Sequence, residues 1–186
     1  MAADRRIRFS PRRAFGIGLA VLFVPLLGLT VVAASNGGPS IADVRAATAK
    51  YHDINSAKAD GYTELRDAAG IACIANLPTG TMGIHYVKGS LVGDGVINAT
   101  TPEALVYEPL ANGQLKLVAL EYVEIQDVWH QANGPSTPTV LGMTMRAVPA
   151  GNRYGLPAFF ERHAWIWSDN PLGTFEDYSS KVSCGR

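Results

Sequence analysis

The chain has 186 residues, of which 47% are hydrophobic and 17% are charged, with 16 basic and 16 acidic residues. Residues 1–34 hold five arginines and one acid, so the remaining 152 residues carry a net charge of −4. A mildly acidic domain of this size has room for a sizeable core, and its charge argues against nucleic acid or an anionic membrane surface as a partner.

The N-terminus has the pattern of an export signal. Five arginines precede an almost uncharged run over residues 15–34, which ends in small residues that a signal peptidase accepts. We therefore predict a signal peptide over residues 1–34 and a periplasmic, extracellular or membrane-anchored location outside the cytoplasm. The run is long enough to span a bilayer, so an uncleaved N-terminal anchor is the alternative, and it would be the only contact with a membrane. Arg12 and Arg13 suit twin-arginine export as well as the general secretory route.

A leader over residues 35–40 precedes a single predicted domain over residues 41–186. Apolar residues recur at helical spacing after Ser40, a plausible N-cap, which predicts one amphipathic helix over residues 41–60 that ends at Gly61. Tyr51 and Ile54 belong to its apolar stripe. We expect both side chains to be buried against a sheet.

After residue 80 the hydrophobic period changes to two, which is typical of β-strands. The predicted strands cover residues 81–88, 104–108, 115–125, 140–147 and 160–168. Asn112-Gly113 separates the second strand from the third and predicts an antiparallel hairpin. One N-terminal amphipathic helix packed on about five antiparallel strands is an α+β fold, with the strands forming either a curved sheet or a small barrel.

The two cysteines, Cys73 and Cys184, are expected to form a disulfide. An isolated pair in one exported domain meets an oxidising compartment, and the bond would tie the C-terminal tail to the segment after the first helix. A thiolate metal site is the alternative, but neither cysteine has the close second cysteine that such sites use.

Three predicted strands each carry one side chain that is costly to bury among apolar neighbours: His85, Glu121 and His163. Alternation places Glu121 on the inward face with Leu117 and Val123. We predict that the three side chains meet in one pocket. Two imidazoles and a carboxylate are the ligands of many catalytic zinc sites and also suit Fe(II), so the predicted cofactor is a divalent metal, zinc or iron.

The same three residues are the predicted catalytic residues, because His and Glu can act together as an acid/base pair. The alternative is structural, with each histidine hydrogen-bonded to Glu121 or to the backbone in a packed core. Tyr86, Trp165 and Trp167 are the predicted ligand-binding residues, and alternation puts both tryptophans on the face of His163. Aromatic pairs on an inward face also serve as core.

Two further histidines are weaker candidates. His52 lies on a mixed face of the predicted helix, and His130 lies at the edge of a polar loop.

Several segments of the chain, MGIHYV, PEALVYEP, LVALEYV and HAWIWSDNPLGTFEDY followed by VSC, resemble a group of exported bacterial proteins of unassigned activity. The resemblance covers most of the mature chain and implies export, but it implies no reaction. Cupins also place His and Glu on strands, but their motif begins HxH with a Glu close behind. His85 has no such partner.

These observations predict an exported protein that binds a small molecule or a metal ion in a His/Glu/His pocket. The alternative is an extracytoplasmic enzyme, a lyase, isomerase or hydrolase, that uses a His–Glu acid/base pair. The third hypothesis is an accessory protein that docks a partner through an aromatic face. A deep, ligand-sized cavity favours an enzyme, whereas a shallow exposed apolar patch favours docking.

Overall fold

The computed structural model describes residues 37–185, so the predicted signal peptide lies outside the described residues. Residues 35–186 belong to one compact unit. Within residues 37–185, no helix is long and apolar enough to cross a membrane. The elements in chain order are α1 (Ile41–Thr48), the 3₁₀ helix η1 (Ala49–His52), α2 (Ile54–Ala59), β1 (Thr63–Glu64), β2 (Cys73–Asn76), β3 (Gly80–Val87), β4 (Ala104–Pro109), β5 (Leu115–Ile125), α3 (Gln126–Asn133), β6 (Thr139–Val140), β7 (Met143–Thr144), β8 (Arg146–Val148) and β9 (Phe159–Ala164).

The fold is α+β, as predicted, and it is built on one antiparallel sheet. The strand order is β1-β3-β4-β5-β9-β8, and β2 also pairs with β3. The ends of this path do not pair with each other, so the sheet is open and the small-barrel alternative is wrong. β6 and β7 form a separate two-stranded sheet.

The predicted hairpin is confirmed by antiparallel pairing of β4 with β5. Its register shifts by one residue: Val106 pairs with Ala119, but Tyr107 pairs with Leu117, which leaves Val118 as the extra residue of a β-bulge. Because of this bulge Leu117 packs with Tyr107 on the face opposite Glu121. The sequence prediction that Leu117 and Glu121 share a face is therefore wrong.

The N-terminal helix is interrupted, where the sequence pattern predicted one continuous helix. Ser40 and Asp43 form a capping box that starts α1. At Asp53 the backbone is extended, and its carboxylate accepts a hydrogen bond from the Asn55 amide, so Asp53 caps a second helix instead of continuing the first. Tyr51 is buried as predicted, but Ile54 is only half-buried.

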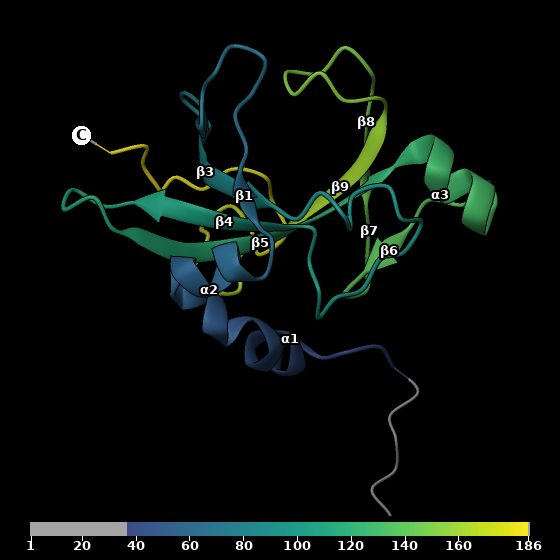
Figure 1. Ribbon diagram of the computed structural model, residues 1–186, viewed down its shortest axis with the longest axis horizontal. Helices are drawn as coiled ribbons and strands as arrows, with labels where there is room; N and C mark the ends of the chain where they lie inside the picture. The colour runs from purple at the N-terminus through teal and green to yellow at the C-terminus, as the bar shows by residue number, and fades with distance from the viewer. Residues whose placement is uncertain (1–36, 186) are drawn as a thin grey trace, which may run out of the picture. The chain divides into compact units, whose positions relative to one another are not determined.

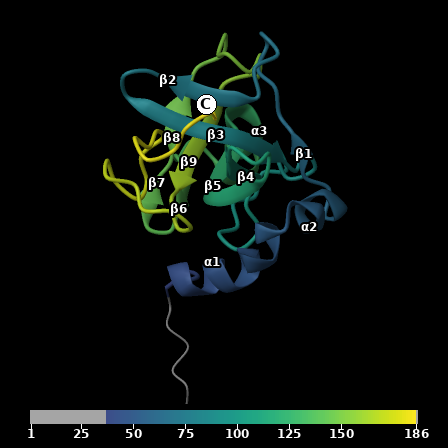
Figure 2. The same cartoon turned by 90° about the vertical axis from the view of Figure 1, so that its left-hand side faces the viewer.

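The helical segment covers one face of the sheet, where tyrosines fill the core. The Tyr107 hydroxyl donates to the Tyr51 carbonyl at 2.8 Å, and the Tyr62 hydroxyl donates to the Pro102 carbonyl at 2.7 Å. Figure 1 shows α1 and α2 below the central strands, and Figure 2 shows the same arrangement from the side. The opposite face of the sheet is therefore left for other parts of the chain.

Replacing Ile54 with Ala should lower the free energy of unfolding by only about 1–2 kcal/mol, because a half-buried isoleucine loses less than the 2–5 kcal/mol typical of a fully packed one. Urea denaturation measures the change. Ile41→Ala is the matched control, since Ile41 is 37% exposed in the first turn of α1 and should change stability less. A loss above about 3 kcal/mol would mean that Ile54 packs more tightly than its exposure indicates.

The last two predicted strands are shorter than expected. The stretch 140–147 is broken between β6 and β7 by a turn in which Leu141 and Gly142 both have positive φ, at 52° and 77°. β9 ends at Ala164, so Trp165 and Trp167 follow the strand rather than alternate along it. The short strands β1 and β2 had no period-two signal.

The predicted disulfide between Cys73 and Cys184 is confirmed, and their Cα atoms lie 5.6 Å apart. The bond joins β2 to the C-terminal tail. Since disulfides persist in oxidising compartments, it indicates an extracytoplasmic environment.

Candidate metal centre

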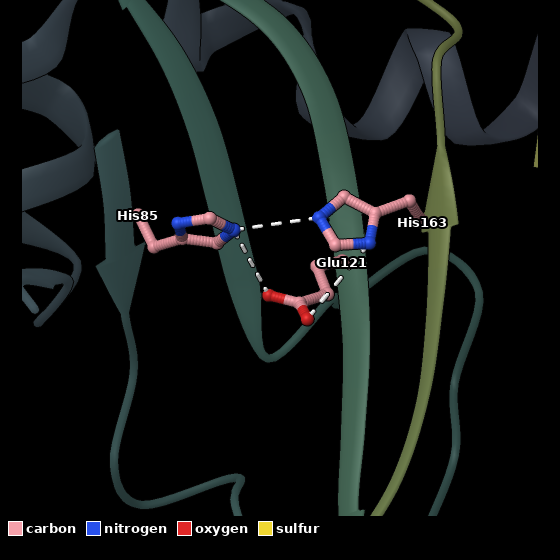
Figure 3. Close-up of side chains that lie close together, drawn as sticks. All are labelled: His85, Glu121 and His163. Carbon is pink, nitrogen blue, oxygen red and sulfur yellow. Dashed lines mark hydrogen bonds and ion pairs between the residues drawn. The ribbon is translucent and has the colours of Figure 1, made fainter. Parts of the chain in front are cut away.

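His85, Glu121 and His163 meet on the face of the sheet that the helices leave uncovered, so the prediction of convergence is confirmed. They come from β3, β5 and β9, and Glu121 pairs directly with His163 across neighbouring strands. Figure 3 shows both imidazoles and the carboxylate pointing toward one another. All three side chains are buried: His85 is 1%, Glu121 6% and His163 0% exposed.

A glycine helps to bring β3 close to β4 beside this centre. Gly83 has a φ of +120°, and a Cβ added there would lie 2.5 Å from the Tyr107 carbonyl oxygen. Another residue at this position would push β3 from β4 two residues before His85. The glycine therefore contributes to the position of the His85 side chain.

The distances between the three side chains match those of a metal ligand set. His85 Nε2 lies 3.4 Å from His163 Nε2 and 3.4 Å from Glu121 Oε2. One ligand atom from each residue lies within 4.8 Å of the others. An ion bound tetrahedrally at about 2.1 Å has ligand atoms about 3.4 Å apart, so two of the separations already have the required value.

Burial keeps both histidines uncharged, the state in which imidazole binds metal. It lowers the pKa of His85 to about 4, with a smaller contribution from Arg153. Burial also lowers the pKa of His163, helped by the neighbouring His85. Neither ring therefore has to lose a proton at neutral pH before it donates a nitrogen lone pair.

Glu121 is in the opposite situation, because its charged form is disfavoured. Burial raises the pKa of its carboxyl group well above the usual range, and repulsion from the Glu161 carboxylate adds to the effect. Glu161 is itself paired with Arg146, at 2.5 Å from Nη2, and Arg146 also contacts Asp177. The centre therefore lies beside two further carboxylates that share one arginine.

Both histidines keep a buried Nδ1 without a hydrogen-bond partner in the described chain. The Nδ1 atom of His163 lies 3.9 Å from Asp177 Oδ1, just beyond hydrogen-bonding distance. Metal-bound histidines usually donate this N–H to a carboxylate or a carbonyl group. Asp177 is thus placed to orient His163 after a small shift.

The sequence interpretation missed Glu161, Asp177 and Arg146. Glu161 had a usable signal, because it lies two residues before His163 on the same strand and must share its face. Asp177 lies in an irregular tail segment, where no periodicity indicates a direction. Arg146 follows the break in the predicted strand 140–147.

The aromatic residues predicted to bind a ligand are only partly near the centre. The Trp165 ring stacks beside His163, with ring centroids 6.3 Å apart, but Trp165 is buried and its Nε1 donates to the Glu176 carbonyl. Trp167 lies against His52, and Tyr86 packs on Tyr107 on the helix-covered face. The structure therefore does not bring Trp167 or Tyr86 to the three central residues.

The weaker histidine candidates also lie elsewhere. His52, at the end of η1, contacts Trp167, and His130 on α3 lies beside Phe160. Both are exposed.

A cavity of about 300 Å³ adjoins the centre on its open side. The Glu121 carboxyl group forms part of its wall, whereas neither His85 nor His163 lines it. Glu121 is therefore the member of the centre that faces the cavity.

Acid should destabilise the metal-free protein through His85. Its pKa is about 4 when folded and about 6.5 when unfolded, so between these values only the unfolded chain is protonated there. Above pH 6.5 the neutral histidine does not lower the free energy of unfolding. As the pH falls to about 4, protonation of the unfolded chain at this histidine lowers the free energy of unfolding by about 3 kcal/mol. Urea unfolding between pH 7 and pH 4 measures the loss.

Glu121 opposes this trend, because its raised pKa adds a proton to the folded chain as the pH falls. The comparison is therefore made in the Glu121→Gln background, with and without His85→Gln. Removal of His85 should flatten the pH dependence, whereas His130→Gln, a change at an exposed histidine, should not. An equal slope with and without His85 contradicts the prediction.

Comparison with known proteins identifies no relative: no family model, no curated protein and no solved structure matches the chain.

Proposed function

We propose that the protein binds one divalent metal ion, zinc or iron(II), through His85, Glu121 and His163, and that it works outside the cytoplasm. The observation that carries the proposal is the pair of 3.4 Å separations from His85 Nε2 to the other two ligand atoms. Both separations agree with tetrahedral coordination at about 2.1 Å. The disulfide supports the location.

Electrostatics support the same proposal. Two uncharged imidazoles lie beside a carboxyl group that is crowded by Glu161 and buried away from water. A divalent cation would supply the missing positive charge and pair with the otherwise costly carboxylate. This environment supports the proposal of an ion at the centre.

Three protein ligands leave at least one coordination position for water or a small molecule. Structural zinc sites usually have four protein ligands, whereas catalytic and ligand-binding sites have three. The proposed ion therefore binds water or a small molecule at its open position and does not serve only to stabilise the fold.

The test is metal analysis of the exported protein, purified without chelators, followed by Co²⁺ titration of the metal-free form. We expect about one ion per chain and the visible absorption bands of tetrahedral cobalt. His163→Ala should lose the ion, whereas His130→Ala, at an exposed histidine outside the centre, should keep it. A wild-type chain that binds neither Zn²⁺ nor Co²⁺ at micromolar concentration contradicts the proposal.

Metal binding should release protons, and we expect them to come from Glu121. Ligands must be deprotonated to bind, and only Glu121 among the three has a raised pKa. Below that pKa the apparent affinity should rise about tenfold per pH unit. Calorimetry in two buffers of different ionisation enthalpy measures the number of protons released, and a value near zero contradicts this assignment.

An acid/base enzyme is the second candidate, favoured by the position of Glu121 in the cavity wall. A carboxyl group with a raised pKa next to two histidines can act as a general acid. This candidate replaces the first if the centre remains functional without any metal. The third hypothesis, docking through an aromatic face, has no support from Trp165 or Trp167, since the first is buried and the second is half-buried.

A further inference from the structure

The cavity beside Glu121 has walls suited to a small apolar molecule. Its volume is about 300 Å³, at the lower end of the range of small-molecule sites. Apart from Glu121, Tyr154 and Gly89, its lining is hydrocarbon or aromatic: Leu65, Val87, Val92, Val123, Leu156 and Phe159. A molecule of about a dozen non-hydrogen atoms would fill such a space.

Two loops that form the cavity walls are fastened to each other. One follows β1 and carries Leu65, and the other joins β8 to β9 and carries Tyr154 and Leu156; both rise on the side of the sheet opposite the helices (Figure 1). Arg153 Nη2 donates to Asp67 Oδ2 at 2.7 Å, and the Ala68 amide donates to the Arg153 carbonyl at 2.9 Å. These contacts hold the two walls of the cavity in a fixed position relative to each other.

The lining also limits the charge of the occupant. No lysine, arginine or histidine lines the cavity, so the proposed ion is the countercharge that an anionic end group would meet there. The only carboxyl group in the wall belongs to Glu121, which in the proposed function is a ligand of the ion and has no free charge for an ammonium group. Burying an unpaired ammonium group is strongly unfavourable.

We infer that this cavity binds a largely hydrocarbon molecule with one oxygen-bearing end group, a hydroxyl, carbonyl or carboxylate, and that this end group lies at the Glu121 end, next to the ion. The inference rests on the proposed function, because the ion takes up the charge of Glu121 and offers a position for the oxygen. The walls select the apolar body, and the centre selects the oxygen-bearing end group.

The test uses three probes that share a naphthalene ring and differ only in their end group: 2-naphthylmethanol, 2-naphthoate and 2-naphthylmethylamine. Binding to the wild-type protein as purified is measured by ligand-observed NMR and by naphthalene fluorescence. We expect 2-naphthylmethanol and 2-naphthoate to bind, and 2-naphthylmethylamine to bind at least about tenfold more weakly than either. Equal or tighter binding of 2-naphthylmethylamine, or no binding of either oxygen-bearing probe, overturns the inference.

Variants that fill the cavity locate the binding. Leu156→Trp and Val92→Phe narrow it from two different loops without touching the three central residues, and each should weaken 2-naphthylmethanol binding about tenfold or more. Leu172→Trp adds the same bulk at a position that is 51% exposed and outside the cavity lining, and it should leave binding unchanged. Unchanged binding in both cavity variants overturns the inference.

Metal analysis of the same samples separates this inference from the proposed function. An ion in the wild type without probe binding refutes the inference alone, whereas probe binding in a chain that takes up no ion refutes the proposed function. In protein loaded with paramagnetic Co²⁺, the methylene protons beside the probe hydroxyl should relax faster than the far ring protons. The reverse order overturns the assigned orientation.

Discussion

Replacing Glu121 with Gln should stabilise the metal-free protein at pH 8 and weaken its metal binding by about a hundredfold or more. The stabilisation follows from the raised pKa, because at pH 8 the unfolded chain ionises Glu121 freely, whereas the folded chain must either protonate it or bury its charge. We expect a gain of about 1–4 kcal/mol, the range for relieving a buried charge. The gain should shrink as the pH falls and disappear below about pH 4.5, where both states are protonated.

Glu108→Gln is the matched control for this change. Glu108 is a half-buried carboxylate on β4 that lies 3.8 Å from Lys116 Nζ, away from the centre. The Glu108→Gln change should leave metal binding unaltered, and it should not produce the pH-dependent gain in stability expected for Glu121→Gln. Chemical denaturation at pH 5 and pH 8 in the presence of a chelator gives the stabilities, and Co²⁺ titration gives the affinities.

The sign of the stability change distinguishes a functional centre from a structural network. In a satisfied hydrogen-bond network, removal of one member leaves its partners unpaired, so stability falls. In a centre arranged for an ion, the buried carboxylate destabilises the fold while no ion is bound. Replacing it with an uncharged amide therefore raises the stability of the metal-free form. A Glu121→Gln protein that is less stable than wild type at pH 8 would therefore favour the structural alternative.

The convergence of the three central residues could be predicted because it depends on period-two alternation and on the free-energy cost of burying polar side chains separately. His85, Glu121 and His163 each lie on a strand among apolar neighbours, and burying them separately would be expensive. The direct pairing of Glu121 with His163 across β5 and β9 was not predicted, because one sheet does not fix the order or register of its strands. The α+β class followed from the change of period after the helical segment.

Details that depend on backbone irregularity could not be predicted in the same way. The bulge at Val118 moves Leu117 to the other face, and no residue in that strand marks it. Strand alternation predicts that Trp167 lies on the same face as His163. Because β9 ends at Ala164, Trp167 lies instead against His52 in the helical segment. Alternation fails wherever the strand stops or gains a residue, because each irregularity reverses the face of all residues beyond it.

The cavity beside Glu121 was also beyond sequence reasoning. Tyr154 and Leu156 lie in a loop between β8 and β9, and Leu65 lies in another loop far away in sequence. Loops have no period from which the direction of a side chain follows. Their proximity depends on the contact between Asp67 and Arg153, which are 86 positions apart.

Removing the disulfide should cost up to about 4–5 kcal/mol of stability, the largest single effect that we expect outside the centre. The bond closes a loop with a sequence separation of 111 residues, so its loss restores much freedom to the unfolded chain. The double variant Cys73→Ser with Cys184→Ser tests this by urea denaturation. Ser180→Ala, an exposed change in the same tail, is the control and should shift the midpoint little.

The same variant should weaken metal binding modestly, by about tenfold, because the tail that the disulfide anchors carries Asp177 beside His163. The tail is also held by reciprocal backbone hydrogen bonds between Thr81 and Ser179, both 3.0 Å long. Gly80 permits this approach, since a Cβ there would lie 2.7 Å from the Ser179 carbonyl oxygen. If metal affinity is unchanged while stability falls, these backbone contacts suffice to hold Asp177, and the disulfide acts on the unfolded chain alone.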